Sequence, residues 1–413
     1  MPDEKVTINI SEEQIKKPAK EPKKDVGTSK KWLTVSIFGA VAALAGVACL
    51  VASFLIPKEA LPDLTFPKIP SSETTGEKVY SNLTGLELAN ADQKTAPAYC
   101  IQTPNGTDGA RPQSGLTDAG VVFEAIAEAG ITRFAAIYQN PSQAVIGPIR
   151  SLRMYFLDWD VPFDCIIINA GGSADAIDSL RAGGYKNLQE NYAYMYRGTY
   201  GGRLWNNLFT TSAYLQQFAN DAGFTKSEIK GFARMTPDEA KRKFVDSTVS
   251  EKINITKATE KDTSARAAEV ARTVFNFGGW DMFNVVYDYD ISSNTYKRTY
   301  ADGEPHNVYN CPADNLGERN PEDVCSLVQL SPSVVIAMVV EERRAADNYH
   351  ENITTAGSGK AYVFQNGTVT VGTWKKDNRE SQIQFLDENG AEIKLIPGQT
   401  FISAVPNYGS VAY

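Results

Sequence analysis

One stretch of the sequence restricts the fold more than any other, because it is a long apolar segment whose exposure to water would be unfavourable. Residues 32–57 contain no Asp, Glu, Lys or Arg, and residues 32–56 are mostly Val, Ala, Leu, Ile, Phe and Gly. A helix of that length measures about 37 Å, enough to cross a hydrocarbon layer of about 30 Å with some tilt. The sequence therefore predicts a single transmembrane helix at 32–56.

The charges on either side of this segment predict its orientation. Residues 1–31 hold eight lysines and six acidic residues and lack apolar periodicity, which is typical of a disordered tail. Lys30 and Lys31 come directly before the apolar segment, whereas Lys58 after it is accompanied by Glu59 and Asp63. Because basic flanks stay on the cytoplasmic side, we expect the tail in the cytoplasm and residues 58–413 outside the membrane.

A cleaved signal peptide and a lipid anchor are the alternatives to an uncleaved helix. A signal peptide has a short basic leader and an apolar core of about 7–15 residues, and this chain exceeds both. Cys49 follows small residues, as a lipidated cysteine does, but Gly46 stands where a large aliphatic residue is usual. We therefore interpret Cys49 as a plain membrane cysteine and keep lipidation as the alternative.

Net charge argues against nucleic acid as a partner. The 413 residues carry a formal charge of -8, and the part after the apolar segment has 33 basic and 43 acidic residues, a net of -10. Proteins that bind phosphate backbones generally present a basic surface. With only two histidines and five cysteines, we expect no metal centre, and we expect no cofactor.

Export also changes the interpretation of the cysteines, because disulfides form in oxidising compartments. Cys311 and Cys325 are 14 positions apart in a loop-rich stretch, and we predict that they form a disulfide. Cys100 and Cys165 lie in apolar runs and are either a bridge between neighbouring strands or two buried thiols. The apolar surroundings slightly favour the thiols.

Composition and periodicity divide the chain into six parts. The first domain is expected to be α+β, or α/β, with a mixed sheet, and the last to be rich in β-structure. The expected parts are a tail at 1–31, the membrane helix at 32–56, a Pro/Ser/Thr-rich stalk at 57–80, the first domain at 81–225, a helical connector at 226–275, and the second domain at 276–413.

Several elements can be placed within these domains. We predict strands at 98–102, 132–139, 163–170 and 283–289, and a helix at 174–181 that ends at two glycines. Residues 118–129 have apolar side chains at every helical offset and are either a helix or a strand with a bulge. Asp302-Gly303, Asn366-Gly367 and Asn389-Gly390 predict tight hairpin turns.

The junction between the strand at 163–170 and the following helix is a candidate anion site. Gly171 and Gly172 permit a sharp turn, and Ser173 is suited to be the helix N-cap. Free N–H groups of a first helical turn favour an anion. Many such turns have no ligand, and no histidine lies in this domain to activate Ser173 as a nucleophile.

Four arginines in otherwise apolar or turn-like segments form the second candidate group: Arg111, Arg133, Arg150 and Arg153. Guanidinium groups suit carboxylates and phosphates. Glu124 and Glu128, which share a face if their segment is helical, could pair with them, as could Asp158, Asp160 and Asp164. The arginines are thus either an ion-pair lattice that orients strands or the lining of an anion-binding cleft.

The motifs ARPQSGLTDAGVVFEAIAEAGITRFAAIYQ, IGPIRSLRMYFLDW and FDCIIINAGGSADAIDSLRAGG, with SGKAYVFQNGTVTVGTWKK later, resemble the YerB-like lipoprotein family, DUF3048. The resemblance covers most of residues 82–405. It implies a two-part, membrane-tethered extracytoplasmic protein and no particular activity. The family often has His-Asn-Leu where this chain has Asn206-Asn207-Leu208, so a histidine role there is absent or altered, and Asn207 joins the candidate residues.

Three functions fit these observations. The first is an envelope module that binds an anionic cell-wall or lipid-linked ligand, or a protein partner, through the arginines and the 171–173 turn. The second is an envelope enzyme. It is either a glycan hydrolase, with paired carboxylates such as Glu124 and Glu128 with Asp158 or Asp160, or a phosphotransferase-like protein whose arginines grip a pyrophosphate. The third is a structural tether. The sequence leaves enzyme activity open, and we favour the first function over an enzyme.

Overall fold

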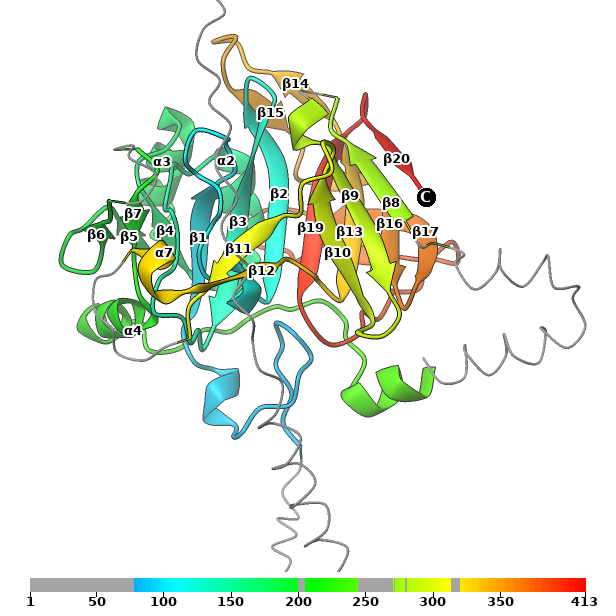
Figure 1. Cartoon of the computed structure of the whole chain (residues 1–413), viewed down its shortest axis with the longest axis horizontal. Coiled ribbons are helices and arrows are strands. Elements are labelled where there is room, and N and C mark those ends of the chain that lie inside the picture. Colours follow the sequence, from blue (N-terminus) through cyan, green and yellow to red (C-terminus); the bar gives the residue numbers. More distant parts are fainter. Residues whose placement is uncertain (1–77, 200–204, 244–269, 271, 279–280, 313–319) are drawn as a thin grey trace, which may run out of the picture. The chain divides into compact units, whose positions relative to one another are not determined.

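The computed structural model describes residues 78–199, 205–243, 270, 272–278, 281–312 and 320–413 (Figure 1). The predicted tail, membrane helix and Cys49, together with nearly all of the stalk, lie outside these residues. Within the described ranges, no helix is both long and apolar enough to cross a membrane.

A ten-stranded mixed sheet runs through the compact unit Gly76–Tyr413. Its order is β18-β17-β16-β13-β19-β2-β3-β1-β4-β5 (Figure 1). The strands are β1 (Ala98–Pro104), β2 (Val121–Glu128), β3 (Ile131–Gln139), β4 (Ile166–Asn169), β5 (Asn187–Gln189), β13 (Val334–Val340), β16 (Gly357–Gln365), β17 (Thr368–Lys376), β18 (Gln384–Leu386) and β19 (Thr400–Pro406). Since β19 pairs in parallel with both β13 and β2, one sheet joins strands from both predicted domains.

Smaller sheets and short helices surround this sheet. A four-stranded sheet contains β8 (Arg272–Asn276), β9 (Val285–Asp290), β10 (Thr295–Tyr300) and β20 (Ser410–Ala412). Two-stranded ribbons pair β6 (Tyr196–Arg197) with β7 (Leu208–Phe209), β11 (Asn307–Asn310) with β12 (Ser326–Gln329), and β14 (Glu342–Arg344) with β15 (Glu351–Ile353). The helices are α2 (Met154–Asp160), α3 (Ala174–Ala182), α4 (Ser212–Asp221) and α7 (Pro321–Val324).

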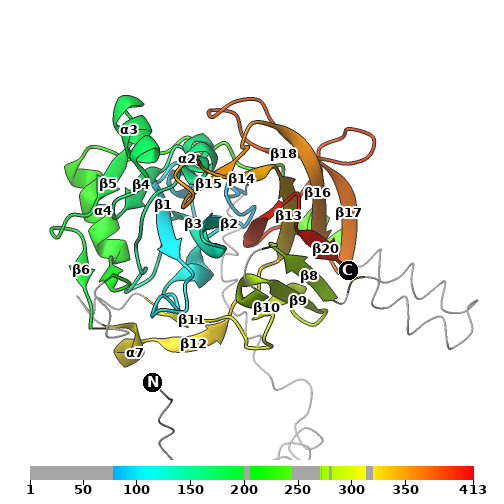
Figure 2. The ribbon, with the colours of Figure 1, turned by 90° about the horizontal axis from the view of Figure 1, so that it is seen from above.

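The strands of the first half are buried on both faces. In β1, Cys100 joins a core that includes Trp159 of α2, while its neighbour Tyr99 joins a second core that includes Leu215 of α4. Figure 2 shows the layout from above, with the helices gathered around β1, β4 and β5. Such a strand shows no alternation of apolar and polar residues, because both faces exclude water. The mixed, sheet-rich architecture that the sequence predicts is confirmed.

Residues 121–128 form strand β2 rather than a helix. All eight residues are buried, and the pairing with β3 shifts by one residue between Ile126 and Glu128, as in a bulge. Glu124 and Glu128 therefore do not share a helical face. The strand predicted at 163–170 is shorter, because Val161–Phe163 form a turn of 3-10 helix and the strand begins at Ile166.

The predicted helical connector is partly wrong. A helix spans 237–243, and its start is a capping box in which Thr236 N–H donates to Glu239 and Glu239 N–H donates to Thr236 Oγ1. Residues 272–275 were expected to be helical but belong to strand β8, which pairs with β9 and β20. Sheet pairing outweighs the weak helical preference of this segment. The residues between these two elements are almost all outside the described ranges.

The described residues form two disulfides, one within a short loop and one between neighbouring strands of the sheet. Cys311 pairs with Cys325, which confirms the prediction. Cys100 pairs with Cys165, with Cα atoms 5.7 Å apart, so the interpretation as buried thiols is wrong. Cys100 lies in β1 and Cys165 directly precedes β4, the parallel neighbour of β1. The alternative interpretation, a bridge between neighbouring strands, is the one that the structure has, across a sequence separation of 65 residues.

Candidate functional site

The carboxyl ends of the parallel strands β1 and β4 meet at one edge of the sheet, and residues 150–153 cross it. Arg150 N–H donates to Gln102 O of β1 (2.8 Å), and Ala170 N–H, just after β4, donates to Arg150 O (3.0 Å). Leu152 N–H donates to Gly171 O (3.0 Å). Ligands of open α/β sheets bind outside the carboxyl ends of parallel strands. We call the group of Arg133, Arg150, Arg153, Glu128 and the turn 171–173 the Arg150 edge.

A single carboxylate holds two of these arginines. Arg133 Nη2 donates to Glu128 Oε1, and Arg153 Nη2 donates to Glu128 Oε2 at 2.9 Å. The two arginine side chains are only 11% and 6% exposed. Burial, reinforced by the nearby charge of Arg153, lowers the pKa of Arg133 to about 10. Because one carboxylate is shared by two guanidiniums, the cluster carries a surplus positive charge.

Arg150 adds a third positive charge at the same place. It is half-buried, and within the described residues its guanidinium donates no hydrogen bond and makes no ion pair; its Nε is fully buried without an acceptor. Burial lowers the pKa of Arg150, and Asp108 and Glu128 act against this shift. Arg153 Nε is also buried without an acceptor, but its other guanidinium nitrogens have partners. Because buried donors without partners are rare in folded proteins, Arg150 is the group of this edge best suited to hold a ligand.

The 171–173 turn is bonded to the backbone of residues 150–152 and is exposed on its other side. Gly171 has a φ of +69°, which favours glycine, and the only heavy atom close to a Cβ built there is Ser151 Oγ at 4.0 Å. Gly171 and Gly172 are exposed. Ser173 occupies the N-cap position of α3, but its hydroxyl makes no capping hydrogen bond. The prediction of a serine side-chain cap is therefore wrong, and in the first turn of α3 the N–H of Ala176 donates to Asp175 Oδ1 instead (2.8 Å).

Asn207 lies in the β6–β7 ribbon and bonds to residues of that ribbon, not to the Arg150 edge. Its Oδ1 accepts from Arg197 Nη1 (3.0 Å), and its Nδ2 donates to Gly198 O (2.8 Å). Arg197 Nε in turn donates to Tyr192 Oη (2.8 Å). Tyr192 and Trp205 are each 60% exposed, which is unusual for large aromatic side chains. Sequence reasoning missed these two residues, although aromatic residues in a polar loop are a readable signal.

Two family models match this chain: the DUF3048 N-terminal domain over residues 83–225 and the DUF3048 C-terminal domain over residues 276–402, both described as a protein of unknown function. The chain belongs to the DUF3048 family. It is 27% identical to "Putative lipoprotein YerB" of Bacillus subtilis (strain 168) over 386 residues, which cover 92% of this chain and 96% of that protein.

The fold is also similar to the crystal structure of the YerB protein from Bacillus subtilis. The TM-score is 0.61 at 22% identity, and the match covers 81% of this chain and 100% of that one. At this identity the similarity supports a shared DUF3048 fold and says nothing further about activity.

Arg111 and Glu124 of the DUF3048 chain lie in a different cluster from the Arg150 edge. Arg298 Nη2 donates to both carboxylate oxygens of Glu124 (2.8 and 2.9 Å), and both side chains are completely buried. Arg111 stacks on the ring of Tyr300 at 3.7 Å from the centroid and donates from Nε to Asn105. The expectation that all four arginines form one group is therefore wrong for Arg111.

This second cluster, which we call the Glu124 network, joins the two family regions. His306 Nδ1 accepts from Arg298 Nη1, so the ring is neutral with its proton on Nε2, which donates to Gln113 Oε1 (3.0 Å). Ser403 and Thr132 also donate to the Glu124 carboxylate. Sequence reasoning missed Arg298 and His306, since nothing in their segment marks them as partners of a residue 174 positions earlier.

Each of the acidic residues considered for glycan hydrolysis is either fully buried or already bound by side chains of this protein. Glu124 and Asp160 are fully buried, and Glu128 is bound by two arginines. Asp158 accepts from Arg379 Nε and from Thr355 Oγ1, each at 2.6 Å. A glycosidase needs two carboxyl groups that face a sugar across an open groove. These four residues do not supply such a pair.

Proposed function

We propose that this chain is a membrane-anchored extracytoplasmic binding module of the bacterial envelope, and that the Arg150 edge binds an anionic cell-wall polymer. The predicted helix at 32–56 and the lipoprotein name of the Bacillus subtilis relative both support attachment to the membrane. The second hypothesis, an envelope enzyme, has no free pair of carboxylates among the residues considered for it.

One observation carries the ligand proposal: within the described residues the guanidinium of Arg150 has no partner, in a cluster that already has more arginine than carboxylate. The backbone of Arg150 and Leu152 is bonded to the turn that contains the two exposed glycines. A phosphate or carboxylate would accept from the planar guanidinium in a bidentate manner. Tyr192, which accepts from Arg197 of the β6–β7 ribbon, and Trp205, which precedes β7, are exposed and offer apolar faces for sugar rings. Charge and aromatic surface together suit an anionic glycan.

Binding of a purified glycerol-phosphate wall polymer to the compact unit Gly76–Tyr413 tests this proposal. Arg150→Ala is expected to weaken binding about tenfold, because one charge-assisted contact contributes roughly 1.5–3 kcal/mol. Arg272→Ala is the matched control, since Arg272 is 64% exposed in a different sheet. Equal affinity of the two variants, or no binding by the unchanged protein at low salt, would contradict the proposal.

The anchor needs a separate test in whole cells. A protease added outside the cell is expected to degrade residues 58–413 and to leave the tail protected, because the lysine-rich flank stays inside. Incorporation of a labelled fatty acid that Cys49→Ala abolishes would instead support the lipid anchor.

A further inference from the structure

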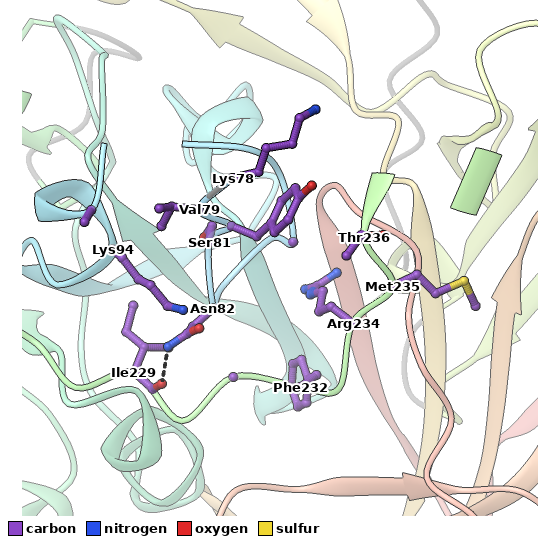
Figure 3. A pocket seen from close by; sticks show the side chains of 14 residues that line it. Lys78, Val79, Ser81, Asn82, Lys94, Ile229, Phe232, Arg234, Met235 and Thr236 are labelled. Atoms are coloured by element: carbon purple, nitrogen blue, oxygen red, sulfur yellow. Dashed lines mark hydrogen bonds between the residues drawn. The ribbon is translucent and has the colours of Figure 1, made fainter. Parts of the chain in front are cut away.

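A pocket of about 740 Å³ lies at the beginning of the described chain, away from the residues of the Arg150 edge. It is formed by two segments, 78–94 and 229–236, which meet through the hydrogen bond from Asn82 Nδ2 to Ile229 O (3.3 Å; Figure 3). We call it the N-terminal pocket.

The charged residues of this lining are all positive. Lys78, Lys94 and Arg234 contribute cations, and none of the described lining residues is Asp or Glu. This is unusual in a chain with a net charge of -8. Lys78 pairs with Glu87 at 3.0 Å, whereas the ammonium of Lys94 has no partner within the described residues. Figure 3 shows Lys94 and Arg234 approaching the pocket from opposite sides.

Arg234 is a cation with no carboxylate partner. Its Nη1 donates to Ile396 O and Gly398 O, and its Nη2 donates to Leu83 O and to Thr400 Oγ1, so all four partners are neutral. Its Nε is buried without an acceptor. Burial alone lowers the pKa of Arg234 to about 9, and no nearby acid opposes this. The positive charge of Arg234 is therefore not neutralised by the fold, and it favours an anion in the pocket.

The pocket also offers apolar surface and a defined position along the chain. Val79, Ile229, Phe232 and Met235 line it beside the cations, which suits a ligand with both an anionic and an apolar part. Lys78 follows the predicted membrane helix by 21 intervening residues, which reach at most about 75 Å when fully extended. The pocket is thus tethered within reach of a lipid surface.

We propose that the N-terminal pocket binds a phosphate-bearing headgroup of an anionic membrane lipid. Lys94 contacts the phosphate, Arg234 supplies a fixed positive charge behind it, and the apolar lining receives the adjoining glycerol and acyl carbons. This site uses none of the residues of the Arg150 edge, and it holds whether or not a wall polymer binds there.

Vesicle binding by Gly76–Tyr413 tests this proposal. This compact unit contains all of the described core residues and lacks the predicted membrane helix, which would insert by itself. We expect binding to vesicles that contain phosphatidylglycerol and not to phosphatidylcholine vesicles. Lys94→Gln is expected to weaken binding about fivefold, because one lysine near an anionic membrane surface contributes roughly 1 kcal/mol to binding. Lys226→Gln, an exposed lysine outside the pocket, is the matched control, and its binding is expected to stay unchanged.

Two further arms separate the possible outcomes. Soluble glycerol phosphate is added as a competitor in the first arm. If it binds in a Lys94-dependent manner while vesicles do not bind, the ligand of the pocket is a soluble phosphate compound. The proposal of a lipid headgroup would then be wrong. Arg150→Ala is expected to leave vesicle binding unchanged, because the pocket uses no residue of the Arg150 edge. A failure of the wall-polymer proposal can therefore be told apart from a failure of the pocket proposal. Equal loss in Lys94→Gln and Lys226→Gln, or no binding of either form of phosphate, overturns the pocket proposal.

Discussion

Strand β2 carries two glutamates four positions apart, and they belong to two very different ionic clusters. Glu124 is fully buried, and Arg298 meets it with two hydrogen bonds. Glu128 is shared by Arg133 and Arg153, and the neighbouring Arg150 has no partner at all within the described residues. Glu124 is paired with Arg298 at a completely buried position, whereas Glu128 is shared between two arginines in a cluster that lies beside exposed glycines.

Position along the strand explains the difference. Glu124 pairs with residues of both β3 and β19, so its surroundings are sheet on both sides. Glu128 follows the bulge at the end of the strand, where the pairing with β3 is irregular and β19 no longer contributes a partner. We therefore expect the Glu124 network to contribute stability and the Arg150 edge to contribute binding.

The largest effect is expected from removing the charge of Glu124. Glu124→Gln leaves Arg298 charged and buried without its carboxylate, which is expected to cost about 3–5 kcal/mol. Urea unfolding of Gly76–Tyr413 measures this loss. The double variant Glu124→Gln with Arg298→Met removes the stranded charge and is expected to recover part of the stability. A loss below about 1 kcal/mol in the single variant would contradict the description of Glu124 and Arg298 as a buried pair in which each charge depends on the other.

A smaller loss is expected at Glu128. Glu128→Gln leaves Arg133 and Arg153 close together without a carboxylate, but both keep backbone acceptors, Ser151 O and Leu152 O. We expect a loss of about 2 kcal/mol, within the range for an unsatisfied buried group. The same unfolding measurement compares it with Glu124→Gln, and an equal or larger loss at Glu128 would remove the proposed contrast.

The Glu124 network also predicts a pH dependence of stability. Burial, with the charges of Arg298 and Arg111 acting in the same direction, holds the pKa of His306 well below its ordinary value of 6.5. Below pH 6.5 the unfolded chain binds a proton that the folded chain does not, so stability falls as the pH falls, by up to about 1.4 kcal/mol per pH unit. His306→Gln is expected to lose this slope.

Glu342 acts in the opposite direction and has to be removed from the measurement. Burial raises its pKa from 4.5 to about 7, so the folded chain binds its proton more tightly and the stability that it contributes falls as the pH rises from about 4.5 to 7. The free energy of unfolding is therefore compared between the single variant Glu342→Gln and the double variant Glu342→Gln with His306→Gln. The comparison covers pH 5 to pH 7, roughly the window in which a histidine of the unfolded chain titrates. Parallel curves would mean that His306 does not contribute the slope.

The smallest effect on stability is expected at Arg150. Because its guanidinium has no partner within the described residues, Arg150→Ala is expected to change the free energy of unfolding by less than about 0.5 kcal/mol. The same variant is expected to lose binding of the wall polymer. A large loss of stability would show that Arg150 holds the fold, and the contrast with Glu124 would then be wrong.

The sequence by itself determined the local features of this protein. Strands β1 and β3, helix α3 ending at Gly183, and the capping box of Thr236 and Glu239 all follow from residues that are neighbours along the chain. The Asn366-Gly367 hairpin, with φ values of +55° and +67°, and the Cys311–Cys325 disulfide, 14 residues apart, are equally local. Short-range preferences and turn chemistry are sufficient for such features.

The tertiary structure alone decided which charged residues meet. In the sequence, Glu124 and Glu128 look equivalent and so do Arg111 and Arg150, but β19 and the β2 bulge place them in separate clusters. The Cys100–Cys165 disulfide depends on the parallel pairing of β1 and β4, and the ion pair of Glu124 depends on a residue 174 positions later. A strand buried on both faces carries no periodic pattern that reports its neighbours, so these long-range pairings cannot be inferred from the residues alone.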